Sequence, residues 1–185
     1  NIPDEGNVII AANHKSNLDP IFLAAAIENR QVAAIAKKEL FDIKPLAYIL
    51  KKLNVIPINR EKPDISTIKN ILKAIKDGYV LGIFPEGTRT GWDGIVKLNR
   101  GAVSIGLRSA KVITPITIKM NPLSLKKGHP WYKIPDRQIH YELSVGDDID
   151  PKEWIENQSI PMASRRLTKY LEDYFNSQTS QKGSQ

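Results

Sequence analysis

The chain of 185 residues contains no cysteine. This absence excludes disulfide bonds, thiolate zinc sites and a cysteine nucleophile, and it fits a reducing compartment. The chain also lacks any apolar run that approaches the ~18 to 20 residues needed to span a bilayer, and it shows no signal peptide. It begins at Asn1 rather than at a methionine, close to the first expected strand, so we expect that a preceding segment has been removed or left out.

The sequence also lacks internal repeats and a second hydrophobic core, which favours one domain. Hydrophobic residues make up 41% and charged residues 25% of the chain, a composition typical of a globular protein. The formal net charge is +7 and the pI is about 9.5. An anionic partner is therefore expected, and charge alone leaves nucleic acid, acidic lipid and a phosphorylated small molecule open.

Hydrophobic periodicity predicts an alternation of strands and helices. The expected strands are 7–13, 32–37, 54–60, 79–84, 111–119 and 138–146, and the expected helices are 20–29, 45–53, 65–77, 101–110 and a closing helix from Ile160. This pattern predicts an α/β fold, a single-domain α/β sandwich with a largely parallel or mixed central sheet. We place the domain at residues 1–177 and a polar, mobile tail at 178–185.

Local signals refine several of these boundaries. Asp19 followed by Pro20 is expected to cap the first helix, and Asp64 or Ser66 the third, which Gly78 would close. Pro115 within its strand predicts an edge strand or a bulge.

Polar clusters follow several of the predicted strands. The first is NHKSNLD (13–19), where His14 and Asp19 lie five positions apart. A loop of this length can turn the carboxylate toward the imidazole, leaving the other ring nitrogen as a base. For the motif alone the alternative remains open that Asp19 only caps the helix and that His14 is a polar loop residue.

The cluster PEGTRT (85–90) follows another buried strand. Exposed amides of Gly87 and Thr88, with the guanidinium of Arg89, would suit a phosphate, although a tight turn with a surface salt bridge would give the same pattern. Arg60 ends a third strand and could equally be an edge residue that reaches solvent. In open α/β sheets ligand groups gather beyond the carboxyl ends of the strands, so we expect these clusters and the region of Pro115 to lie at one edge.

Two other histidines and a basic segment carry less information. His129 and His140 are expected to be surface or packing residues. The segment with Lys126, Lys127 and Lys133 beside Trp131 and Tyr132 could contact nucleic acid or a lipid headgroup layer, or form a solvated loop.

Four ordered segments resemble the glycerolphosphate and lysophosphatidic acid acyltransferases of phospholipid synthesis. NHKSNLD is similar to the NHxxxxD block of that family, NVIPINR to its second block, FPEGTRT to its third and VITPIT to its proline-containing fourth. The similarity runs from about Asn7 to Ile118. Two details depart from the family pattern: Asn54 stands where the second block often has glycine, and the basic residue before the later glycine is Arg100, with Lys97 nearby.

This resemblance implies transfer of an acyl group from acyl-CoA or acyl-carrier protein to a glycerol hydroxyl, without a metal or another cofactor. His14 would be the general base and Asp19 its orienting partner, while the acceptor pocket would be lined by Arg60, Glu86, Gly87, Thr88 and Arg89. Glu86 would orient Arg89 or accept from a glycerol hydroxyl, since it would repel a phosphate. A neutral histidine contributes typically ~10² to 10⁴ in rate by removing the hydroxyl proton.

The leading hypothesis is therefore an acyltransferase that converts 1-acylglycerol-3-phosphate to phosphatidic acid. Its partners would be the lysophospholipid acceptor, the acyl donor and a membrane surface, with no nucleic acid. The expected location is the cytoplasmic side of the cell membrane, as a peripheral protein or one anchored by a missing N-terminal segment. Alternatives are an acyltransferase for another lysolipid, a metal-dependent phosphoesterase using His14, Asp19 and Glu86, and a basic nucleic-acid-binding module.

Overall fold

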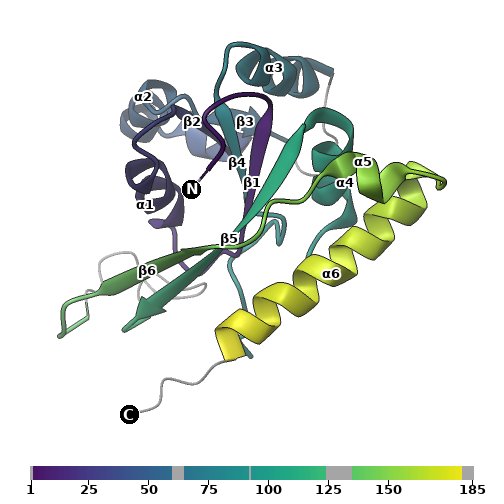
Figure 1. Ribbon diagram of the computed structural model, residues 1–185. Helices are drawn as coiled ribbons and strands as arrows, with labels where there is room; N and C mark the ends of the chain where they lie inside the picture. Colours follow the sequence, from purple (N-terminus) through teal and green to yellow (C-terminus); the bar gives the residue numbers. More distant parts are fainter. Residues whose placement is uncertain (1, 60–64, 92, 124–134, 181–185) are drawn as a thin grey trace.

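The computed structural model describes residues 2–59, 65–91, 93–123 and 135–180 (Figure 1). The elements are β1 (Val8–Ala12), α1 (Asp19–Ala26), β2 (Val32–Lys37), the 3-10 helix η1 (Lys38–Asp42), α2 (Lys44–Lys52), β3 (Ile56–Ile58), α3 (Ile65–Lys76), β4 (Val80–Ile83), α4 (Arg100–Ser109), β5 (Val112–Asn121), β6 (His140–Val145), α5 (Pro151–Ile155) and α6 (Ile160–Ser180). Every strand and helix that the sequence predicts is present, with shifted ends.

The strands form one six-stranded sheet in the order β3-β2-β4-β1-β5-β6. The first five strands run parallel, and β6 pairs antiparallel with β5. The predicted α/β sandwich with a largely parallel or mixed sheet is therefore confirmed. Central β1 is buried along its whole length, as expected for a strand covered on both faces.

Alternate residues of β1 enter two hydrophobic cores, one on each face of the same sheet, so a second core that the sequence did not indicate is present within one fold. Ile9 and Ala11 pack into a core with residues of α3, α4 and α6, whereas Val8, Ile10 and Ala12 pack into a core with α1. This alternation follows from the period of two in a strand. The result is a three-layer domain in which α1 covers one face and α3, α4 and α6 cover the other (Figure 1).

The two cores place the connections after β1 and β4 on opposite faces of the sheet. The chain leaves β1 for α1 on one face, and it leaves the adjacent strand β4 for α4 on the other. Neighbouring parallel strands whose connections diverge in this way open a crevice at their carboxyl ends. The local folding pattern therefore creates a site between the β1–α1 loop and the β4–α4 loop.

One predicted helix cap differs in the structure, and another falls partly outside the described residues. Asp19 is the first residue of α1 rather than its cap, because Leu18 occupies the N-cap position. Helix α3 begins at Ile65, so Ser66 lies inside the first turn, and Asp64 lies outside the described residues. Gly78 follows α3 with a positive φ of 87°, which agrees with the predicted glycine end.

Asn54 adopts the left-handed conformation, with φ of 53°. Few residues other than glycine tolerate this region, and asparagine is among those that do. At the position where the resembling family often has glycine, this chain therefore has a residue in a conformation that glycine also adopts readily.

Pro115 lies at a bulge on the β6 side of β5. Residues 146–148 lie opposite residues 114–115, between the Ile116–Val145 pair and the bridge of Ile113 with Ile149. Three residues therefore face two, and the Pro115 carbonyl accepts from the Gly146 amide at 2.9 Å. Of the two predicted possibilities, a bulge is confirmed, whereas an edge position is wrong because β5 lies between β1 and β6.

The closing helix α6 buries one side chain in almost every turn. The buried hydrophobic residues are Ala163, Leu167, Leu171 and Phe175. Tyr170 of the same helix is 46% exposed. The helix continues to Ser180, so residues 178–180 of the expected tail are helical, and residues 181–185 lie outside the described part. No helix among the described residues is both long enough and apolar enough to cross a bilayer.

Candidate active site

His14 and Asp19 form a buried pair directly after β1. His14 Nδ1 lies 2.9 Å from Asp19 Oδ2, and the two side chains are 14% and 0% exposed. A carboxylate accepts only, so Nδ1 carries the proton and Nε2 keeps its lone pair. No described residue hydrogen-bonds to Nε2. The Phe84 ring packs against the imidazole with centroids 4.5 Å apart. The imidazole is therefore positioned by the Asp19 carboxylate and by the Phe84 ring.

Asp19 also organises the loop that carries the histidine. Its Oδ2 accepts from the backbone amides of Lys15 at 2.5 Å and Ser16 at 2.7 Å, in addition to His14. The Asp19 amide in turn donates to the Ser16 carbonyl at 3.2 Å. The carboxylate therefore points back into the preceding loop, which explains why it does not cap the helix. The pair is five residues apart in the sequence because this turn needs that length to bring Asp19 back to His14.

Asn13 fixes the start of the loop against β5. Its side-chain amide donates to the Ile118 carbonyl at 3.0 Å, and its Oδ1 accepts from the Ile118 amide at 2.6 Å. Main-chain pairing of β1 with β5 ends at Ala12 and Ile116. Asn13 therefore continues the ladder with its side chain, leaving its own backbone to turn away toward His14. The sequence alone did not reveal a role for Asn13, although it directly precedes the histidine.

The FPEGTRT loop holds both backbone groups of His14. The His14 amide donates to Glu86 Oε1 at 2.7 Å, and the His14 carbonyl accepts from the Thr90 amide at 2.6 Å. The Thr90 hydroxyl lies 3.0 Å from both the His14 carbonyl oxygen and Glu86 Oε1. These contacts confirm that the two clusters meet at one edge of the sheet. Thr90 is a further residue whose role the sequence did not reveal.

Two charged side chains beside the pair are perturbed by burial. Burial raises the pKa of Glu86, and the hydrogen bonds from His14 and Thr90 and the charge of Lys15 oppose this rise. Burial lowers the pKa of Lys15, while the carboxylates of Glu86 and Asp19 oppose that change. Both shifts favour the neutral forms, so desolvation dominates in this crevice.

The predicted acceptor residues are only partly brought together. Glu86 Oε1 faces the backbone of His14, and the Gly87 amide, which the sequence suggested for a phosphate, donates to the Phe84 carbonyl at 3.0 Å. Gly87 has a positive φ of 67°, as the turn requires. Thr88 is exposed and Arg89 is half-buried in the same loop.

The remaining predicted residues are either outside the described part of the chain or exposed at its surface. Arg60, His129 and the basic segment 126–133 lie outside the described residues. Strand β3, which precedes Arg60, is separated from β4 by β2. His140 is exposed in β6, as expected of a surface residue. Lys97 and Arg100 are exposed near the start of α4.

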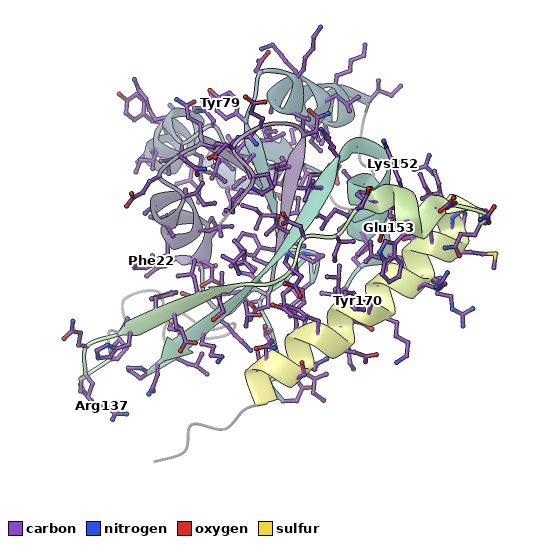
Figure 2. All side chains as sticks on the ribbon, in the orientation of Figure 1. Phe22, Tyr79, Arg137, Lys152, Glu153 and Tyr170 are labelled. Carbon is purple, nitrogen blue, oxygen red and sulfur yellow. The ribbon has the colours of Figure 1, made fainter. Side chains whose placement is uncertain are left out.

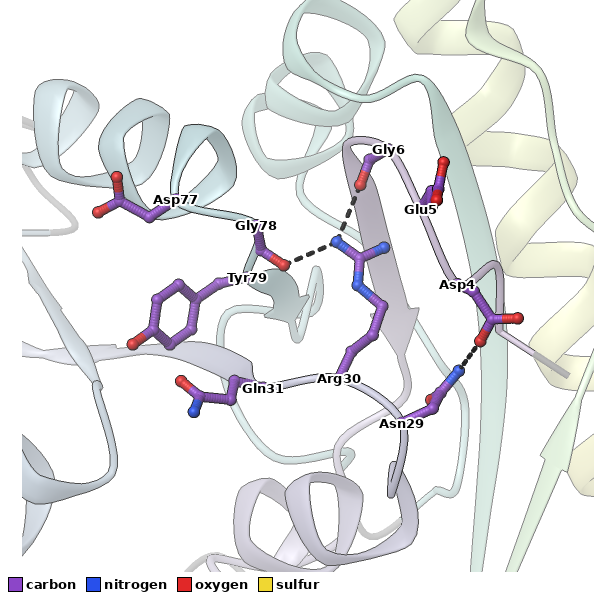
Figure 3. Close-up of a pocket in the computed structure, with 9 residues that line it drawn as sticks. All are labelled: Asp4, Glu5, Gly6, Asn29, Arg30, Gln31, Asp77, Gly78 and Tyr79. Carbon is purple, nitrogen blue, oxygen red and sulfur yellow. Dashed lines mark hydrogen bonds between the residues drawn. The ribbon is translucent and has the colours of Figure 1, made fainter.

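A hollow of about 420 Å³ lies at the opposite, amino-terminal edge of the sheet (Figure 3). It is lined by segments that precede β1, β2 and β4, and Arg30 crosses it to the carbonyls of Pro3, Gly6 and Gly78 at 3.2, 2.9 and 2.7 Å. The guanidinium thus joins three loops on the side away from His14. Its contacts are with backbone carbonyls, which indicates a structural role.

The chain is similar in sequence to known acyltransferases. A protein-family model described as Acyltransferase matches residues 1–119. The 1-acyl-sn-glycerol-3-phosphate acyltransferase of Bacillus subtilis is 41% identical over 115 residues, which cover 62% of this chain and 57% of that protein. The enzyme of the same name from Helicobacter pylori is 32% identical over 176 residues, covering 91% of this chain and 72% of that protein.

The solved structures include a protein of the same fold. The crystal structure of the 1-acyl-sn-glycerophosphate acyltransferase PlsC from Thermotoga maritima aligns with a TM-score of 0.72 and 21% identity, covering 100% of this chain and 70% of that one. Among the curated relatives, the chain spans about half the length of those from Bacillus subtilis, Streptococcus pneumoniae and Borreliella burgdorferi.

The matched region contains β1, the His14–Asp19 pair and the FPEGTRT loop, which are the parts from which the crevice is built. Since the family model spans 119 of the 185 residues, and a relative is matched over most of both chains, this chain belongs to the acyltransferase family that includes the 1-acylglycerol-3-phosphate acyltransferases.

Proposed function

We propose that the protein transfers a fatty acyl group from a thioester donor to the free hydroxyl of 1-acylglycerol-3-phosphate, giving phosphatidic acid. The observation that carries this proposal is the His14–Asp19 pair, with 2.9 Å between Nδ1 and Oδ2 and with Nε2 left as the basic nitrogen. The names of the curated relatives support the same reaction.

The proposed chemistry needs one base and no covalent intermediate. His14 Nε2 removes the proton of the acceptor hydroxyl as its oxygen attacks the thioester carbonyl, and the imidazolium that forms is stabilised by Asp19. The tetrahedral intermediate then expels the thiolate, which takes the proton back from Nε2. The products are the ester and the free thiol, and the histidine returns to its neutral form. No serine or cysteine nucleophile is required.

For the acceptor we propose the loop that carries Glu86, Gly87, Thr88 and Arg89, together with Arg60. The arginines would bind the phosphate, because a planar guanidinium matches two phosphate oxygens at once. Replacing Arg89 by lysine keeps the charge but loses this fork, so lysophosphatidate should bind more weakly. An Arg108→Lys variant, at an exposed position in α4, is the matched control. If Arg89→Lys reduces the use of monoacylglycerol equally, Arg89 does not bind the phosphate.

The donor is proposed to be acyl-CoA or acyl-carrier protein, used without a metal or another cofactor. Purified protein is incubated with each donor and lysophosphatidate, and the released thiol is measured. Because the chain has no cysteine, a thiol-reactive dye reports only the product. We expect release that depends on the acceptor and persists with a chelator. No release with either donor would refute the proposed reaction, and stronger use of another lysolipid in competition would redirect it.

We further propose that the domain acts at a membrane surface, on the cytoplasmic side of the cell membrane. Helices α1 and α2 lie on the same side of the domain (Figure 1). Along α1, η1, α2 and the residue after it, large apolar side chains are between 37% and 66% exposed: Ile21, Phe22, Leu40, Ile43, Tyr48, Ile49 and Leu53. Exposed lysines accompany them at positions 38, 44, 51 and 52. We call this set the α1–α2 surface.

Apolar and basic side chains together are suited to an anionic bilayer, where each well-placed basic residue contributes about 1 kcal/mol. Vesicle flotation across a salt series tests this. We expect binding to anionic vesicles that weakens with salt, and a further loss when Tyr48 and Ile49 become serine. Equal binding to neutral and anionic vesicles would contradict the electrostatic part.

A further inference from the structure

Tyr141 of β6 approaches the His14–Asp19 pair from the far edge of the sheet. Its ring stacks on Phe22 of α1, with centroids 4.1 Å apart and planes 22° apart. Phe22 follows Asp19 by three residues, so both lie on one face of the helix. The stacked ring therefore has its hydroxyl near the first turn of α1. Figure 2 labels Phe22 on this side of the molecule and Tyr79 at the other end of the sheet.

Two buried oxygen atoms in this region have no hydrogen-bond partner among the described residues: the Tyr141 hydroxyl and Asp19 Oδ1. The other carboxylate oxygen, Oδ2, already accepts from His14, Lys15 and Ser16. The Tyr141 hydroxyl is a donor, and Asp19 Oδ1 is an acceptor with free lone pairs. The Ser16 and Asp19 side chains nevertheless lie close enough to the phenol to shift its pKa through hydrogen-bond interactions, and the Asp19 charge adds to this, although neither contact meets the geometry of a formed hydrogen bond.

We propose that Tyr141 is a positioning residue, which donates its hydroxyl proton toward Oδ1 of Asp19 in the free protein as well as in the complex with substrate, and thereby holds Oδ2 toward His14. This inference rests on the proposed acyl transfer for its kinetic part only. Hydrogen bonds in unliganded catalytic sites are often long and shorten in the complex with substrate. With a donor on each oxygen, the plane of the carboxylate is fixed, because a partial rotation would lengthen the hydrogen bonds at Oδ1 and at Oδ2 together.

The phenol remains a donor over the whole useful pH range. Burial raises the pKa of Tyr141 to about 12, the Asp19 carboxylate acts in the same direction, and the Ser16 hydroxyl opposes it. A raised pKa favours the neutral hydroxyl, so its proton is present at every pH at which an acyltransferase would be assayed.

A spectroscopic test needs no substrate. In protein labelled with ¹⁵N-histidine, the Nδ1 proton of His14 should give a downfield resonance, which a His14→Ala sample assigns. Tyr141→Phe keeps the ring on Phe22 and removes only the hydroxyl. We expect this resonance to move upfield or to broaden through faster exchange with water. The control is Tyr79→Phe, which removes the same atom from a half-buried ring at the amino-terminal edge.

Kinetics give the second measurement. Tyr141→Phe should lower kcat about tenfold, the effect expected for one hydrogen bond to a charged group, and leave KM for lysophosphatidate nearly unchanged. Tyr79→Phe should leave both unchanged. Circular dichroism and thermal unfolding establish that each variant is folded.

The outcomes separate the two proposals. An unchanged Nδ1 resonance in folded Tyr141→Phe overturns the positioning role, whatever the activity, and assigns any lost turnover to packing. A changed resonance with an unchanged kcat also overturns it, because the orientation would then not serve the reaction. If the wild-type protein releases no thiol but the resonance changes as expected, Tyr141 still positions Asp19 and only the proposed reaction fails.

Discussion

Asp19→Asn removes the charge of the pair while keeping most of its hydrogen bonds. All three hydrogen bonds to the Asp19 side chain reach Oδ2. An asparagine can place its carbonyl oxygen there and its amide nitrogen at the Oδ1 position, so the loop should keep its shape. What is lost is the attraction between the carboxylate and the imidazolium that forms during transfer.

The size of this loss can be worked from the structure. At the observed 2.9 Å, and with an effective dielectric constant of ~20, two unit charges attract by about 6 kcal/mol. That energy corresponds to roughly 10⁴ in rate, and because the amide dipole keeps part of the attraction, we expect kcat to fall by about 10³ to 10⁴. KM for the acceptor should change little, since the side chain is buried and is not proposed to bind it.

The assay is thiol release at saturating acyl-CoA and lysophosphatidate, with thermal unfolding to verify the fold. Asp150→Asn is the control, because Asp150 caps α5 through the Lys152 amide and asparagine caps equally well. A folded Asp19→Asn protein with turnover within tenfold of wild type would show that the carboxylate does not stabilise the imidazolium. His14→Ala in the same series should abolish transfer and leave the protein folded.

Three further substitutions test other parts of the structure. Asn54→Ala should lower the free energy of unfolding by about 1 kcal/mol because of the left-handed backbone, while Asn54→Gly should be nearly neutral; equal losses would argue against that conformation. Glu86→Gln should keep stability and most turnover, since burial already disfavours the charge. Glu86→Ala should leave the His14 amide unpaired and lower the free energy of unfolding by about 1–3 kcal/mol in thermal unfolding. Equal stability and turnover of the two variants would refute the role of Glu86 as the partner of the His14 amide. Gly146→Ala should destabilise the protein by about 1–3 kcal/mol, because the new methyl group would overlap the Tyr174 hydroxyl and meet Pro115 Cγ at 3.1 Å. Combining it with Tyr174→Ala should relieve most of this cost. Additive losses of the two substitutions in the double variant would count against this contact.

Most of the features that could be predicted depend on residues close together in the sequence. The apolar runs identified each strand, and the five-residue interval between His14 and Asp19 contained the turn that joins them. These features depend on a few neighbouring residues and on backbone geometry, so the sequence is sufficient for them.

Contacts between distant segments could not be predicted in this way. Asn13 bonds to Ile118, 105 residues away, and Tyr141 lies in a strand whose alternation showed only that one face is buried. Both depend on the strand order, in which β5 separates β1 from β6, and periodicity does not specify order. The hydrogen bond of the Gly87 amide was missed for a related reason, because the bend of its turn directs that amide to Phe84.

The two bonds between the backbone of His14 and the FPEGTRT loop have a consequence for redesign. The segment proposed to recognise the acceptor is also the support of the base, through Glu86 and Thr90. A loop exchanged for that of another acyltransferase, to accept a different headgroup, would therefore also move Nε2. We expect such exchanges to succeed only when the loop after β1 is transplanted together with the loop after β4, so that the inherited unit is the pair of loops.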